Sequence, residues 1–172
     1  MEAILIALLQ AATLVTGAQT DQFVVEAPGR VLTVKVQGNT LAGPDVQASW
    51  SGTELRGSAF DKPLDLKVNG DRIEGLIGGR QVNLRVGKSP EGLRLQGTFG
   101  GQLSDLTIGP SKIDGHLGRC GYTLVPQASV YRGTRKCGLM INAGVSVQIP
   151  AQIAQAEPLR LAADMAVLLG GY

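Results

Sequence analysis

The sequence predicts an all-β protein, an antiparallel up-and-down meander of hairpin repeats about 18 residues long, with a hydrophobic C-terminal helix. Three observations carry this prediction: strict apolar–polar alternation from about residue 23 to residue 149, a glycine that recurs in the strand pattern, and turn signals on two alternating edges. A meander of this length should close as a barrel or fold as a sandwich, with the helix packed on it or in it.

The alternation of side chains is clearest in the middle of the chain. Leu64, Leu66 and Val68 alternate with Asp65 and Lys67, and similar runs follow up to residue 117. Successive strand residues point to opposite faces of a sheet, so one face is expected to be apolar and the other wet. That division is typical of antiparallel sheet.

One glycine recurs at an equivalent place in successive repeats, with spacings of 14, 18, 22, 18 and 18 residues. The six structural glycines are Gly43, Gly57, Gly75, Gly97, Gly115 and Gly133. They share parity with the apolar side chains and are therefore expected on the inner face. A strand glycine marks a bend or a close approach of other backbone. Two uses compete: the glycines could curve the strands sharply, or they could form a trough that receives a helix.

The turn signals lie between the strand runs. Gly78-Gly79, Gly100-Gly101 and Gly118-Arg119 belong to one edge, and Asn69-Gly70 and Ser89-Pro90 belong to the other. Such pairs favour the tight turns of two-residue hairpins. Together these signals predict about 12 strands.

A helix is expected near the C-terminus. Proline suits the first helical turn, which places the start at Glu157-Pro158, and Gly170-Gly171 is expected to end it. Leucine, alanine and methionine cover a wide apolar face, and Arg160 and Asp164 are expected away from the centre of that face. The simplest interpretation is a helix docked on the sheet or plugging a barrel. A membrane-surface anchor and an oligomerisation helix are the alternatives.

The N-terminal segment is an apolar run followed by Val15-Thr16-Gly17, which is typical of a secretory signal peptide. Glu2 stands where such a peptide usually carries positive charge, so a retained apolar helix is the alternative. The predicted organisation is a signal peptide over residues 1–17, a β-hairpin-repeat domain over 18–150, and a C-terminal helix over 151–172 that belongs to the same domain.

The chain has two cysteines, Cys120 and Cys137, each just past an equivalent turn of the repeat. The repeat should bring them to the same edge of the sheet, which predicts a disulfide bond and an oxidising compartment. Secreted, periplasmic or cell-surface localisation follows. If the N-terminal segment is not cleaved, the chain would be cytoplasmic.

The sequence offers little catalytic apparatus. Its single histidine, His116, has the parity of the wet face beside Lys112 and Asp114. The carboxylates are spread singly along the strands, where opposite charges on neighbouring strands are the common explanation. Trp50 is expected in the core or at its rim, with ligand stacking as the alternative. We predict no catalytic residue, no metal ligand, no cofactor and no enzymatic activity.

The composition limits the partners. The formal net charge is only +2 and the basic residues are scattered, so no nucleic acid is expected. Most strands are shorter than the about 9–11 residues of a membrane-spanning strand, which disfavours an outer-membrane barrel. The leading prediction is a non-enzymatic secreted or cell-envelope protein of bacterial type, with a structural or binding role. The alternatives are a carrier of a small apolar ligand inside a barrel, and a self-assembling subunit that uses its terminal hydrophobic segments.

Overall fold

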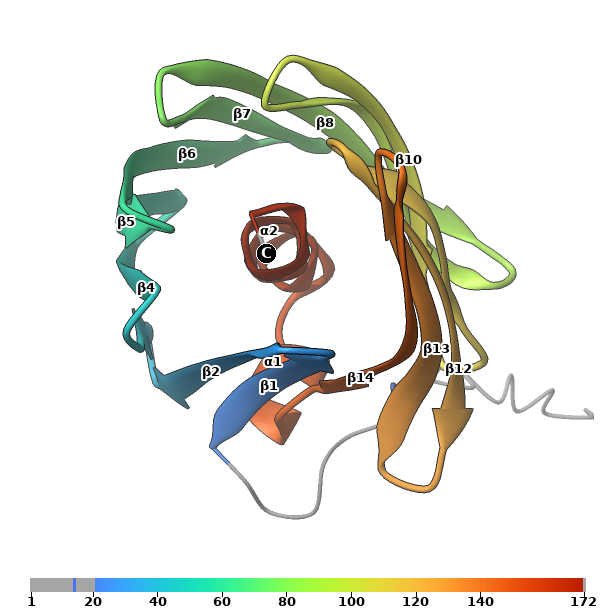
Figure 1. Ribbon diagram of the computed structural model, residues 1–172. Helices are drawn as coiled ribbons and strands as arrows, with labels where there is room; N and C mark the ends of the chain where they lie inside the picture. The colour runs from blue at the N-terminus through green and yellow to red at the C-terminus, as the bar shows by residue number, and fades with distance from the viewer. Residues whose placement is uncertain (1–13, 15–20, 172) are drawn as a thin grey trace, which may run out of the picture.

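The protein is a closed antiparallel up-and-down β-barrel of 14 strands with a helix through its centre (Figure 1). This description rests on a computed structural model that covers residue 14 and residues 21–171. The predicted signal peptide or retained helix over residues 1–17 lies outside the described residues, apart from Leu14. That residue is partly buried against the core.

Each strand pairs with its neighbours in sequence, and the first strand closes the ring by pairing with the last, with Val25 opposite Val147. The strands are β1 (Gln22–Ala27), β2 (Arg30–Gln37), β3 (Thr40–Ala42), β4 (Val46–Ser51), β5 (Glu54–Ala59), β6 (Lys62–Asn69), β7 (Arg72–Ile77), β8 (Arg80–Ser89), β9 (Gly92–Phe99), β10 (Gln102–Ile108), β11 (Ile113–Leu117), β12 (Cys120–Gln127), β13 (Val130–Cys137) and β14 (Met140–Gln148). The prediction of about 12 strands was too low by two. The predicted choice between barrel and sandwich resolves as a barrel.

The glycine repeat follows the hairpins, because each repeat glycine lies on or just after an odd-numbered strand. Four of the six have φ between +123° and +149°, a range that side chains rarely adopt. At Gly75, for example, a Cβ would collide with the carbonyl oxygen of Asp65 on the preceding strand. The close approach of neighbouring backbones is therefore the direct reason for glycine at these positions, and it allows each hairpin to curve around the barrel.

Helix α2 (Pro158–Gly170) runs through the barrel, and the short helix α1 (Ala151–Ala154) precedes it. Every α2 residue from Leu161 to Leu169 is buried. Figure 1 shows α2 end-on, surrounded by the ring of strands. Its backbone comes nearest to the glycine-bearing strands β7, β9 and β11. On these strands the repeat glycines therefore combine the two predicted uses, curvature of the strands and room for a helix.

The predicted ends of α2 are confirmed, and the structure adds the burial of one polar residue, about which the sequence prediction said nothing. Asp164 was expected away from the centre of the apolar face, and its side chain is only 2% exposed. The reason is that strands surround α2 on all sides, so no side of its middle turns faces water.

Candidate functional site

The barrel has two open ends, defined by alternate turns and by the direction of α2. We call the end where α2 begins the Trp50 mouth; its turns are residues 38–39, 52–53, 70–71, 90–91, 109–112 and 128–129. We call the end where α2 finishes the disulfide mouth; its turns are residues 28–29, 43–45, 60–61, 78–79, 100–101, 118–119 and 138–139. Chemistry-bearing side chains gather at both ends.

At the Trp50 mouth, the wall holds α2 through a buried polar contact. Trp50 Nε1 on β4 donates a hydrogen bond of 2.8 Å to Oδ1 of Asp164. Burial raises the pKa of the Asp164 carboxyl to about 6, although the bond from Trp50 and the charge of Arg160 both act to lower it. The carboxyl is therefore largely ionised at neutral pH inside the barrel, where Trp50 and Arg160 stabilise its charged form.

Arg160 joins this cluster from the first turn of α2. Its guanidinium lies 5.5 Å from the centre of the Trp50 ring, and its Nε lies 4.0 Å from Oδ2 of Asp164. It also donates hydrogen bonds to Oδ1 of Asn39, at 2.9 Å, and to the carbonyl oxygen of Gly38, at 2.6 Å. One side chain thus ties the start of α2 to the turn between β2 and β3.

An open depression of about 700 Å³ lies beside this cluster, between α1, α2, two wall turns and strands β4 and β6. Its lining includes Thr53, Gln152, Gln155 and Glu157. Trp50 also borders it, but the indole N–H already bonds to Asp164. Glu157 is the one carboxylate in the described part of this lining.

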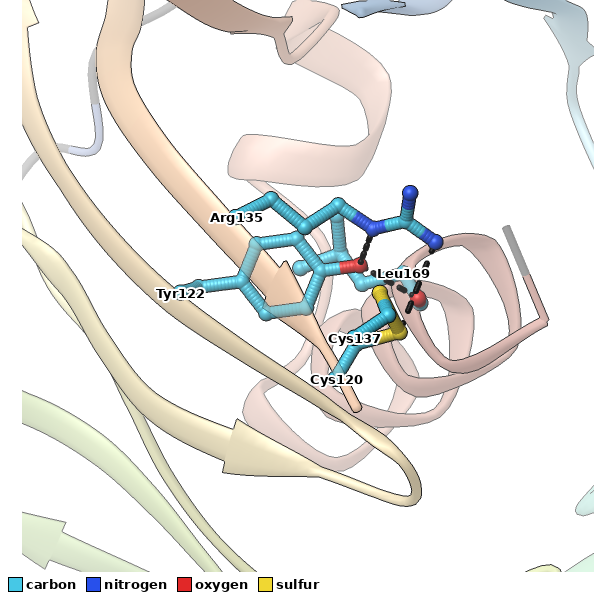
Figure 2. The surroundings of a disulfide bond; sticks show 5 residues. All are labelled: Cys120, Tyr122, Arg135, Cys137 and Leu169. Atoms are coloured by element: carbon cyan, nitrogen blue, oxygen red, sulfur yellow. Dashed lines mark hydrogen bonds between the residues drawn. A yellow bond between two sulfur atoms is a disulfide. The ribbon is translucent and has the colours of Figure 1, made fainter. Parts of the chain in front are cut away.

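At the disulfide mouth, Cys120 and Cys137 form the predicted bridge, with an S–S distance of 2.05 Å between the start of β12 and the end of β13. Figure 2 shows the network around it. Tyr122 donates a hydrogen bond of 2.7 Å from its hydroxyl to the carbonyl oxygen of Leu169, and Arg135 Nε donates one of 3.3 Å to the same hydroxyl. The last turn of α2 therefore has its own bond to the wall.

A basic depression of about 350 Å³ opens at this mouth. Four basic side chains line it, together with Phe60, Phe99 and the end of α2, and the described lining contains no carboxylate; the basic residues are Lys62, Arg80, Arg119 and Arg135. The Phe60 and Phe99 rings pack so closely on Gly171 and Gly170 that a side chain at either glycine would collide with them. Cations also suit the negative end of the helix dipole.

The other sequence candidates lie on the outer wall. His116 is exposed there. Asp65, Asp71 and Asp105 each pair with an arginine of the wall, as expected for cross-strand charges. The hydrogen bond from Arg94 is the main cause that lowers the pKa of Asp105, and the one from Arg85 does the same for Asp71. In residue 14 and residues 21–171, no three His, Cys, Asp or Glu side chains are grouped to hold a metal ion.

No protein-family model matches the chain, and no significant similarity links it to a curated protein or to a solved structure. Neither helix of the described part is long and apolar enough to cross a membrane. The fold defines a class, a closed barrel plugged by its own C-terminal helix. Its function has to be argued from its surfaces.

Proposed function

We propose that this chain is a non-enzymatic structural or binding module of the extracytoplasmic space, which uses its outer surface and its two mouths rather than its interior. The observation that carries the proposal is the plug. Nine consecutive residues of α2, from Leu161 to Leu169, are buried in the place where a barrel carrier would hold its ligand. Glycines that curve the wall and a helix that fills it are the features of a rigid scaffold.

The two ends of α2 make the plug a fixed part of the wall. Asp164 bonds to Trp50 near one mouth, and the carbonyl oxygen of Leu169 accepts a bond from Tyr122 near the other. A ligand that entered the barrel would have to break both contacts and displace a buried apolar helix. This supports the scaffold over the carrier of an apolar ligand.

Export is the second part of the proposal. The Cys120–Cys137 bridge supports it, because disulfides persist in oxidising compartments and are rare in the cytosol. The apolar N-terminal run with Val15-Thr16-Gly17 also supports it, as the pattern of a cleavable signal peptide.

Two measurements test the proposal on the native protein purified from its host. Titration with Nile red, an uncharged apolar probe, should give no saturable binding, whereas a carrier should bind it with a blue shift in emission. The intact mass should correspond to a chain that starts near Ala18 and lacks the two hydrogens of the disulfide. Saturable probe binding would replace the scaffold with the carrier. A full-length chain with two free thiols would overturn export.

A further inference from the structure

Exposed apolar side chains are concentrated at one end of the barrel. Of the seven large hydrophobic residues exposed in the described part, six lie within two residues of a turn at the disulfide mouth: Val31, Leu76, Leu103, Leu139, Met140 and Ile141. The seventh, Val125, lies near the other mouth. Leu139 is 100% exposed and Leu103 is 77% exposed. These outward side chains form an apolar rim around one mouth. The rim extends around the ring of strands, because its residues lie on β2, β7, β10 and the β13–β14 hairpin.

Three exposed cations lie at the same mouth. Lys62, Arg80 and Arg119 are exposed, lie in or next to turns of the disulfide mouth, and form no ion pair within the described residues. On the outer wall, by contrast, Arg56, Arg85 and Arg94 each pair with an aspartate. Exposed cations without an ion pair in the described part also lie towards the other mouth, Lys67, Lys88 and Arg132 among them, so the feature that sets Lys62, Arg80 and Arg119 apart is the depression that they share.

The three cations line one depression. Lys62, Arg80 and Arg119 all border the cavity of about 350 Å³ above the end of α2. The aliphatic stem of Lys62 lies so close over Gly78 that a side chain there would collide with it. Asp45 and Asp61 lie on turns of the same mouth but do not border the depression. The depression thus presents donors for an anionic group without a competing carboxylate in its described lining.

We propose that the disulfide mouth docks on the surface of an anionic phospholipid bilayer. The depression receives headgroup phosphates, and the apolar rim enters the boundary between headgroups and acyl chains. Basic residues near an anionic leaflet and apolar side chains that reach its interface add their contributions to such binding. This inference rests on the proposed function, since it assigns a partner to one surface of the plugged scaffold.

Charge and geometry favour a bilayer over other occupants. Free phosphate would use the depression and leave the apolar rim in water. A second copy docked mouth to mouth would bring two sets of unpaired cations together, and like charges at an interface oppose association. The turns of one barrel end form a ring (Figure 1), and a ring with cations inside and apolar side chains around it can meet a flat anionic surface all at once.

The test is sedimentation of the oxidised protein with vesicles of phosphatidylcholine alone and of phosphatidylcholine mixed with phosphatidylglycerol. We expect binding to the mixed vesicles only, and we expect it to weaken as salt screens the charges. The Arg80→Gln/Arg119→Gln variant should bind about 25-fold more weakly, at about fivefold for each charge removed near an anionic surface. The Leu139→Ser/Met140→Ser variant should lose about tenfold, from lost burial of apolar surface.

The matched controls lie near the Trp50 mouth. Lys88→Gln removes another exposed, unpaired cation, and Val125→Ser removes another exposed apolar side chain. Both should leave vesicle binding unchanged. The exposed positions allow all four variants to fold, which an unchanged thermal midpoint would check.

Four results would overturn the proposal: no binding to mixed vesicles, equal binding to both vesicle types, equal losses in the controls, or a stable dimer that the mouth substitutions dissociate. Binding of inorganic phosphate without binding to vesicles would also overturn it. None of these results would change the exclusion of Nile red or the oxidised mass, so this inference can fail while the proposed function stands.

Discussion

Trp50 and Asp164 join two parts of the chain that are 114 residues apart, through a hydrogen bond of 2.8 Å between the indole Nε1 of β4 and Oδ1 of α2. Both side chains are buried, at 7% and 2% exposure. A buried carboxylate that keeps its donor is tolerated, and one that loses it bears the full cost of its desolvation. The bond therefore makes the seating of α2 a condition for the stability of the whole barrel.

Removal of the donor should destabilise the protein. We expect Trp50→Phe to lower the free energy of unfolding by about 1–3 kcal/mol, because the Asp164 carboxylate is left without its indole partner. Urea denaturation followed by circular dichroism would measure it, since Trp50 is the only tryptophan and its emission is lost with the substitution. In a double-mutant cycle with Asp164→Leu, the two substitutions should be coupled. Strictly additive losses would contradict a direct bond between the two side chains.

Asp164 should also give stability an unusual dependence on pH. Burial raises its pKa to about 6 in the folded protein from the ordinary value of 3.8, so the folded state binds the proton more tightly. The contribution of this group to the free energy of unfolding is then greatest below about pH 4. It falls by a total of about 3 kcal/mol as pH rises, and it levels off above about pH 6. Denaturation midpoints measured across this range should show the fall in the native protein and lose it in Asp164→Asn.

Asp105 supplies the control, because its pKa is shifted in the opposite direction. The bond from Arg94 lowers the pKa of Asp105, so this group contributes stability that is present above about pH 4 and lost at lower pH. Asp105→Asn should weaken the loss in acid and keep the fall between about pH 4 and pH 6. If Asp105→Asn and Asp164→Asn change the same part of the profile, the assignment to Asp164 is wrong.

The barrel and its plug differ in how far the sequence predicts them. The glycine repeat and the alternation are local, so hairpins, turn edges and the Cys120–Cys137 bridge could be inferred residue by residue. The pairing of β1 with β14 is not local: it depends on the summed curvature of all the hairpins. That is why barrel and sandwich could not be separated before the structure.

The two clusters at the mouths were missed for related reasons. In the sequence, Asp164 follows Arg160 by four positions, which is typical of the polar edge of an amphipathic helix. Asp164 is buried only because the barrel wall surrounds the helix on every side. A signal did exist, since Trp50 also needed a partner for its N–H if buried. The cations at the disulfide mouth come from three separate turns, and the depression that they share appears only when alternate turns are grouped by barrel end.

The repeat glycines should tolerate no side chain. We expect Gly75→Ala to lower the free energy of unfolding by about 3 kcal/mol or more, or to prevent folding, because φ is +144° and a Cβ would collide with the carbonyl oxygen of Asp65. Gly87→Ala is the matched control, since a Cβ there would meet nothing within 4 Å and φ is ordinary. The control should gain about 0.5–1 kcal/mol. Equal effects of both substitutions in urea denaturation would show that close approach does not explain the repeat.

The disulfide should stabilise the mouth that it closes. Its cysteines are 17 residues apart, so the chain-entropy estimate for the bridge is about 3 kcal/mol, and Cys120→Ala/Cys137→Ala should lose about that much. Amide exchange should rise first at the start of β12 and the end of β13, where Tyr122 holds the last turn of α2, and the Trp50 mouth should stay protected. Reductant should lower the denaturation midpoint of the native chain and leave that of the double variant unchanged. A native midpoint that is insensitive to complete reduction would mean that the Tyr122–Leu169 bond and the packed helix end secure this mouth without the bridge.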